Sequence, residues 1–214
     1  MDGATLQSKV NYGYMQSAKR VGLPYQVFRA TGPMNPMAGS PLMTLPAAFS
    51  VGNYNFAKAQ EYAKATWQCL IDGSQTQPGD ILVGTAKTYF IAAQQALLPI
   101  LAVEAPRTID VRRPFQQSTV GYSPTYGGTT PAQETPLMTQ WPASILQGTK
   151  GENTGTNVPD DVRDPWWNVL MPSWPGIVIL SSDVLKDDQG RRYIVSSAEL
   201  TPLGWRITCM EAQA

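Results

Sequence analysis

Three aspartates stand just before a pair of tryptophans in the stretch VPDDVRDPWW. Two carboxyl groups on either side of a glycosidic bond can hydrolyse it, one as the acid and the other as the base or nucleophile. Asp160, Asp161 or Asp164 could take these roles, with Trp166 and Trp167 stacking on sugar rings. Alternatively, Asp and Pro shape turns here and the tryptophans pack inside the protein or on a neighbour, and we favour this interpretation.

The sequence supplies little else for covalent chemistry. The 214 residues include no histidine, which removes the commonest general base, the Ser-His-Asp and Cys-His arrangements and the commonest transition-metal ligand. Phosphate-binding GxxxxGK[ST] and GxGxxG motifs are missing, and the glycines of GTKGENTG have the wrong spacing. The three aspartates above, or Asp187 and Asp188, could offer oxygens to Ca²⁺, but no EF-hand spacing supports this. We therefore predict no enzyme activity, no cofactor and no metal.

The charges are balanced overall but not along the chain. Lys and Arg total 16, as do Asp and Glu, so net charge does not direct the chain to nucleic acid or an anionic membrane. The pairs Arg112-Arg113 and Arg191-Arg192 lack the stacking aromatics of a nucleic-acid site. Residues 1–118 hold ten basic and six acidic side chains, and residues 119–214 hold six and ten, about +4 and −4. Head-to-tail stacking of subunits, or simply two different solvated surfaces, would explain this.

The composition favours burial in an assembly. Charged residues make up 15% of the chain, below the roughly 25% of ordinary soluble domains.

No apolar run reaches the ~20 residues that span a bilayer, and the start lacks the pattern of a signal peptide, so we expect a soluble, unexported chain. Cys69 and Cys209 form no CxxC pair, and we expect buried free thiols.

Hydrophobic spacing predicts a helix over residues 4–21, capped by Asp2 and stopped by Gly22. A second, shorter helix is predicted over 54–68. Recurring prolines in 23–49 predict an extended arm that lies on other surfaces.

Short β-favouring runs separated by Gly, Pro or polar residues predict strands. The predicted strands form two groups: 80–84, 88–93, 100–104 and 108–112, then 177–180, 183–185, 192–196 and 204–209. DDQG at 187–190 predicts a turn. The Thr-, Gly- and Pro-rich stretch 116–165 predicts a long loop ordered by neighbouring subunits.

These elements predict a fold that is mainly β with a few helices (α+β): an N-terminal helix, small β-barrel or sandwich modules, an extended Pro-rich arm and a long loop. We expect residues 1–115 to hold the helix, the arm and the first β module. Residues 116–165 would form the excursion, and 166–214 the C-terminal β module.

One plan occurs twice in the sequence. Laying Asp80–Ala105 over Asp183–Ala212 aligns GDILVG with SDVLKDDQG, TYFIAA with RYIVSS, and ILAVEA with LGWRITCMEA. An Asp-led strand, a turn, an aromatic-led strand, a proline-marked connection and a third strand recur in this order. The echo predicts two matched β modules, with chance similarity among short apolar strands as the alternative.

The run SDVLKDDQGRRYIVSSAELTPLGWRI resembles a small β-barrel signature of head–tail joining and neck or tail accessory proteins of tailed bacteriophages. In that signature an Asp-led strand precedes an Asp-x-x-Gly turn and an aromatic-x-Val strand; the first copy departs from it, with Thr85-Ala-Lys87 at the turn. DGATLQSKVNYGYMQSAKRVGL and GDILVGTAKTYFIAAQQALLPILAVEAPRTIDVRRP are similar to proteins encoded among phage morphogenesis genes. The resemblance covers roughly 110 residues at the start and 40 at the end, and implies a non-enzymatic virion protein that forms a ring or attaches at a joint.

The expected function is therefore that of a structural connector or adaptor at the neck, tail or baseplate of a phage particle, assembled in the host cytoplasm. Its partners would be other virion proteins or further copies of itself, with no membrane and no nucleic acid. The aromatic anchors expected at its interfaces are Trp141, Trp166, Trp167, Trp174, Tyr122 and Tyr126. The alternatives are a carbohydrate-binding or carbohydrate-cleaving tail component and a β-barrel interaction module unrelated to phages.

Overall fold

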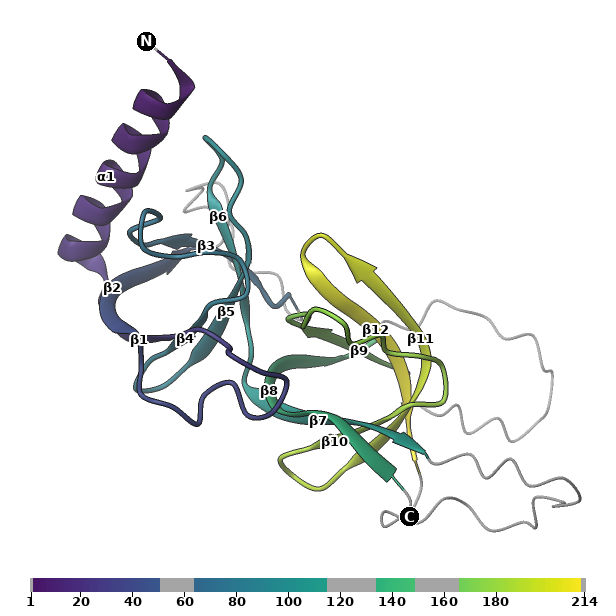
Figure 1. The fold of residues 1–214 in the computed structure, drawn as a ribbon. Coiled ribbons are helices and arrows are strands. Elements are labelled where there is room, and N and C mark those ends of the chain that lie inside the picture. The colour runs from purple at the N-terminus through teal and green to yellow at the C-terminus, as the bar shows by residue number, and fades with distance from the viewer. Residues whose placement is uncertain (1, 51–63, 115–133, 149–165, 213–214) are drawn as a thin grey trace, which may run out of the picture.

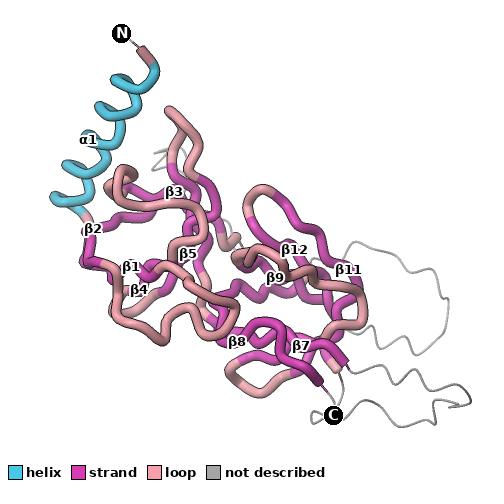
Figure 2. Tube along the Cα trace, viewed as in Figure 1, coloured by secondary structure: helices cyan, strands magenta, loops and turns pink. Residues whose placement is uncertain are grey.

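A computed structural model describes residues 2–50, 64–114, 134–148 and 166–212, and in these residues one helix precedes two closed β-barrels (Figures 1 and 2). The first barrel follows α1 (Gly3–Val21) and is built from β1 (Leu23–Phe28), β2 (Met43–Ser50), β3 (Thr66–Leu70), β4 (Ile81–Val83), β5 (Thr88–Ala93) and β6 (Ile100–Glu104). The second is built from β7 (Arg107–Pro114), β8 (Glu134–Gln147), β9 (Trp166–Met171), β10 (Val184–Asp187), β11 (Arg192–Thr201) and β12 (Gly204–Glu211). The predicted fold class, mainly β with few helices and with small barrel modules, is confirmed.

The two barrels have the same topology. Their strand orders are β1-β2-β3-β6-β5-β4 and β7-β8-β9-β12-β11-β10, and every neighbouring pair is antiparallel. One irregularity also matches, because β5 is bulged between Ile91 and Ala93 and β11 between Val195 and Ser197; the register shifts of the β7–β8 pair have no counterpart between β1 and β2. The matched β modules predicted from the echo are confirmed, and the match extends to all six strands.

Helix α1 forms where the sequence predicts it. The Asp2 carboxylate accepts a hydrogen bond from the Thr5 amide at 2.8 Å, and Lys19 and Arg20 occupy the negative end of the helix dipole. The helix packs against β2 and β3 on the outside of the first barrel and projects beyond it (Figure 1). It buries only Ala18.

Alternating side chains fill each barrel, because successive residues of a strand point to opposite faces of a sheet. The first core includes Val27, Cys69, Ile71, Leu82 and Ile91. The second includes Val111, Trp141, Leu185, Ile207 and Cys209. Both cysteines are free and buried, as predicted.

The barrels also pack on each other. The outer face of the first barrel carries buried apolar side chains from β1, β4, β5 and β6, namely Phe28, Ile81, Phe90, Ala92 and Val103, and Leu146 of β8 and Leu170 of β9 pack against them. The connection between β1 and β2 reaches the second barrel too. Its Pro33 carbonyl accepts a hydrogen bond from the Trp141 indole N–H at 2.6 Å, and the Asn35 amide donates to the Thr139 carbonyl at 2.9 Å.

Several sequence-based predictions are wrong. Residues 23–49 are not one extended arm. β1 and β2 belong to the first barrel, because their alternating apolar residues fill its core. Within this stretch, the connection between β1 and β2 packs on the second barrel. The helix predicted over 54–68 lies largely outside the described residues, and Thr66–Leu70 is a strand. Residues 177–180 form no strand.

The boundaries of the modules also differ from those expected. β7 pairs with β8 and β10, so the second barrel begins near residue 107 and not at 166. Residues 134–147, expected within a long loop, form the longest of the described strands because Met138, Trp141 and Ala143 are buried in the core. The rest of the stretch 116–165 lies mostly outside the described residues.

The contact between Trp141 and Pro33 predicts a specific stability effect. Trp141→Phe removes one of the hydrogen bonds between the modules, whereas Trp205→Phe removes a similar volume from a buried indole whose N–H has no partner among the described residues. We expect Trp141→Phe to lower the free energy of unfolding by about 1 kcal/mol more than Trp205→Phe. Urea unfolding of both variants measures the difference, and equal losses would contradict the prediction.

The buried ionisable groups predict sensitivity to alkali. Burial raises the pKa of Cys209 to about 12, and burial together with Asp187 raises the pKa of Tyr193 to about 12; burial also raises the pKa of Cys69 and Tyr89. The unfolded chain loses these protons above its ordinary values of 9.0 and 10.0 while the folded chain keeps them. The contribution of each group to the free energy of unfolding is therefore complete below its pKa in the unfolded chain. It falls as pH rises towards its pKa in the folded chain, by up to about 1.4 kcal/mol per pH unit for each group.

Urea midpoints measured across the alkaline range test this prediction. Cys209→Ala removes one of the groups, so its stability should fall less steeply with pH than that of the unchanged chain. An identical slope would contradict the assignment.

Candidate interaction surface

The same ion pair occurs in both barrels. In the first, Arg29 follows β1 and makes two hydrogen bonds of 2.7 Å to the two oxygens of Asp80, just before β4. In the second, Arg113 at the end of β7 makes two bonds of 2.9 Å to Asp183, just before β10. Both carboxylates are buried, which is costly unless they are paired. We call each pair a clasp.

Each clasp fixes the turn that leads into the fourth strand of its barrel. Asp80 accepts a hydrogen bond from the Gln77 amide at 2.9 Å, and Asp183 accepts one from the Leu180 amide at 2.8 Å. The residue before each aspartate has a left-handed backbone, with φ of +90° at Gly79 and +75° at Ser182. The paired carboxylates raise the pKa of both arginines.

Further side chains occupy equivalent places. Trp67 and Trp167 lie edge-on to Tyr89 and Tyr193, with ring centroids 6.3 Å and 5.9 Å apart. The ion pair between Lys87 and Glu104 corresponds to that between Arg191 and Glu211. The barrels therefore share local chemistry as well as topology.

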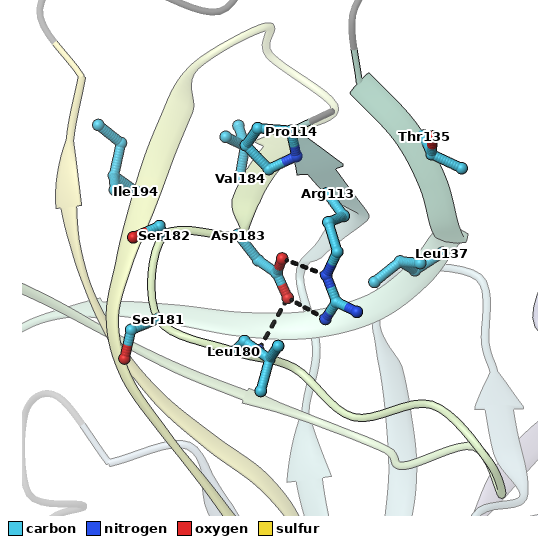
Figure 3. A pocket seen from close by; sticks show the side chains of 10 residues that line it. All are labelled: Arg113, Pro114, Thr135, Leu137, Leu180, Ser181, Ser182, Asp183, Val184 and Ile194. Carbon is cyan, nitrogen blue, oxygen red and sulfur yellow. Dashed lines mark hydrogen bonds and ion pairs between the residues drawn. The ribbon is translucent and has the colours of Figure 1, made fainter. Parts of the chain in front are cut away.

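A groove of 810 Å³ opens beside the clasp of the second barrel (Figure 3). It is lined by Arg113, Pro114, Thr135, Leu137, Leu180, Ser181, Ser182, Asp183, Val184 and Ile194. Figure 3 shows the Arg113 guanidinium turned towards the Asp183 carboxylate, with the apolar side chains around this pair. The two charged groups of the lining are thus bonded to each other.

The equivalent face of the first barrel is covered. Strand pairing places Ile194 opposite Met210 as it places Phe90 opposite Val103, and it places Val184 opposite Ile194 as Ile81 opposite Phe90. Phe90 is 1% exposed under the second barrel, whereas Ile194 is 47% exposed. The groove therefore lies on a face of the second barrel, and the equivalent face of the first barrel is the one that contacts its neighbour.

The groove can bind an apolar surface, since five of its ten lining residues are apolar and its carboxylate is already neutralised by Arg113. Among the described residues, no cluster of three or more Cys, Asp or Glu side chains is placed to hold a metal ion. The helix described here is also too polar to cross a membrane.

The structure separates the predicted aromatic anchors. Trp141 is 1% exposed and bonds within the chain, so its predicted role as an anchor for other proteins is wrong, and it instead links the two modules. Trp167 packs against the core of the second barrel, and the ring centroids of Trp174 and Trp141 are 6.1 Å apart. Trp166 is half-buried on β9. The remaining anchors, Tyr122 and Tyr126, lie outside the described residues.

The acids and dibasic pairs considered as sites have structural partners where they are described. Asp187 accepts hydrogen bonds from the Gln189 and Arg191 amides and from the Tyr193 hydroxyl, within the predicted turn. Arg107 forms ion pairs with Asp187 and Asp188. The ion-pair partners of the dibasic residues are Asp110 for Arg112, Asp183 for Arg113, Glu211 for Arg191 and Glu134 for Arg192. Asp160, Asp161 and Asp164 lie outside the described residues.

Comparison of the chain with protein-family models, with curated proteins and with solved structures gave no match.

The groove and the clasps were not predicted from the sequence, although a signal was present. VFRA at 27–30 and VRRP at 111–114 align the two clasp arginines, and TWQCLI at 66–71 and WWNVLM at 166–171 align the two tryptophans. These segments are short, and they precede the aligned runs, which begin at Asp80 in the first copy and at Asp183 in the second. The connections between them differ in length, so no constant spacing reveals them.

The clasp predicts a large penalty for a small chemical change. Asp183→Asn keeps the shape of the side chain but removes the charge opposite Arg113, and we expect a loss of roughly 2–3 kcal/mol of unfolding free energy. Glu199→Gln is the matched control, because Glu199 and Arg206 form an exposed pair at 3.9 Å, which should contribute about 0–0.5 kcal/mol. Similar urea midpoints for the two variants would contradict the role of the clasp.

Proposed function

We propose that this chain is a non-enzymatic structural component of a tailed-phage particle, acting as a connector or adaptor at its neck, tail or baseplate. The observation that carries the proposal is the open groove of the second barrel, whose counterpart on the first barrel is a buried protein interface. A surface built on the same plan is suited to contact protein.

The chemistry of the groove supports binding rather than catalysis. A catalytic carboxylate must reach a substrate atom, yet Asp183 is 2% exposed and its bonds go to Arg113 and to the Leu180 amide. The same arrangement occurs at Asp80 in the first barrel. A pair repeated in both modules is explained by its role in holding the turn.

Exposed apolar side chains support the same proposal. Val178, Leu180 and Ile194 are 58%, 50% and 47% exposed at or beside the groove. Contiguous apolar surface of this kind marks protein contacts in many soluble proteins. The phage context comes from the resemblance of the barrel sequences to head–tail joining and accessory proteins of tailed phages.

Virion membership is tested directly by mass spectrometry of purified particles of the phage that encodes the chain. We expect the chain in particles at a constant ratio to the major structural proteins. A Leu180→Glu/Ile194→Glu variant should be incorporated at least about tenfold less well, since two charges would have to be desolvated in the contact. Leu200→Glu/Leu203→Glu, at exposed positions near the end of β11 and in the turn that follows it, is the control. Absence of the chain from particles would overturn the proposal.

A further inference from the structure

We infer that residues 33–35, in the connection between β1 and β2, form a strap that holds the two barrels at a fixed orientation. The seat of the strap is the segment 139–141 of β8, where the strand contains an extra residue. The two barrels then move and unfold as one body. This property goes beyond the proposed function and does not depend on it.

Backbone hydrogen bonds run between the strap and its seat in both directions. Met34 and Thr139 form a parallel β-bridge. The Asn35 amide donates to the Thr139 carbonyl at 2.9 Å, and the Thr139 amide donates to the Pro33 carbonyl at 3.2 Å. The Pro33 carbonyl also accepts the bond from the Trp141 indole. The strap therefore lies along β8 like a short added strand, although the two segments belong to different barrels.

The seat is an insertion relative to the repeat. Between two equivalent pairs of the first barrel, β2 has the single residue Thr44 opposite Gln26 of β1. In the second barrel, β8 has two residues, Thr139 and Gln140, opposite the single Asp110 of β7. An extra residue of this kind is a β-bulge, which is left out of the ladder between the strands. The bulge thus makes the backbone of Thr139 available to the strap.

Both sides of the contact contain a strained residue. Asn35 and Gln140 have left-handed backbones, with φ of +40° and +53°, which costs free energy in residues other than glycine and persists where the surroundings hold it. The Gln140 amide donates to the Asp110 carboxylate at 2.9 Å, and the Asn35 side-chain oxygen accepts from the Met37 amide at 3.3 Å. These bonds hold the two conformations that bring the strap and the seat together.

Prolines stiffen the strap. Pro33 and Pro36 stand on either side of Met34 and Asn35, and the ring of each fixes its own φ. A connection with fewer conformations when free loses less entropy when it is seated. Pro33 has no amide to satisfy, and its carbonyl is the group that accepts two bonds from the second barrel.

The strap supplies a second point of contact between the barrels. The apolar interface uses Leu146, which follows Trp141 by five residues in β8, a separation of about 17 Å along an extended strand. Domains of one chain that meet at a single small interface ordinarily move relative to each other. Two separated contacts on one strand prevent this rotation. Figure 1 shows the connection between β1 and β2 reaching from the first barrel to β8.

Two variants of the full chain remove the strap in different ways. Replacing residues 31–40 by Gly-Asn-Gly removes the strap and leaves both strands and the Arg29 clasp in place. Deleting Gln140 removes the bulge, gives β8 the spacing of β2 and keeps Met37, which packs at the apolar interface. Ile91→Val is the control, because it weakens the first core far from the strap.

Calorimetry and residual dipolar couplings measured by NMR give the two readouts, and the NMR spectra show whether each barrel is folded. We expect the unchanged chain and the control to unfold with equal calorimetric and van't Hoff enthalpies, and the couplings of both barrels to fit one common alignment. In both strap variants the barrels should align independently, and the calorimetric enthalpy should be about twice the van't Hoff value.

Three results would overturn the strap. The first is an unchanged chain whose barrels already align independently. The second is a folded strap variant that keeps one alignment and one unfolding transition, because the apolar interface alone would then be sufficient. The third is a replacement of residues 31–40 in which either barrel is unfolded, since the connection would then be required for folding. The replacement decides the matter if the chain without Gln140 does not fold.

Discussion

An apolar outer face on the first barrel is the constraint on which the rest of the structure depends. A closed barrel buries one face of its sheet inside, and its other face ordinarily meets water. Here Phe28, Ile81 and Phe90 on the outside of the first barrel are at most 9% exposed, because the second barrel lies over them. Covering this face fixes the two modules against each other.

The second barrel has the same face in the same place. It has the same strand order, the bulge in its fifth strand and the clasp, but carries Ile194 where the covered face has Phe90 and Arg112 where it has Phe28. A repeat of this kind is stable when each unit covers its neighbour, and its terminal units either carry a cap or offer a binding surface. α1 covers the first end in part, and the groove occupies the second.

The clasps let this face vary while the fold stays constant. A buried carboxylate that accepts two bonds from arginine and one from a backbone amide holds a turn firmly through charge-assisted bonds. Such a turn does not depend on what covers the outside of the barrel. The Asp80 clasp lies beside a face that its neighbour covers, and the Asp183 clasp lies beside an open one.

The sequence by itself determined the local elements and part of the repeat. The caps and apolar spacing of α1, the strands at 80–84, 88–93 and 100–104, and the turn at 187–190 follow from short-range rules of hydrogen bonding and side-chain alternation. The repeat that begins at Asp80 and again at Asp183 can be recognised in the sequence, because the three strands of each copy and their connections keep nearly the same spacing.

Only the tertiary structure decided where the modules divide and which surface is left open. Barrel closure pairs β1 with β4 and β7 with β10, strands that lie far apart in the chain. Residues expected in an arm therefore form core strands of the first barrel, and residues expected in a loop form β8 of the second. The groove depends on the exposure of Ile194 and Leu180, and exposure is a property of the packed chain. The sequence pattern of a strand is the same whether a neighbouring barrel covers its aliphatic residues or leaves them exposed to solvent.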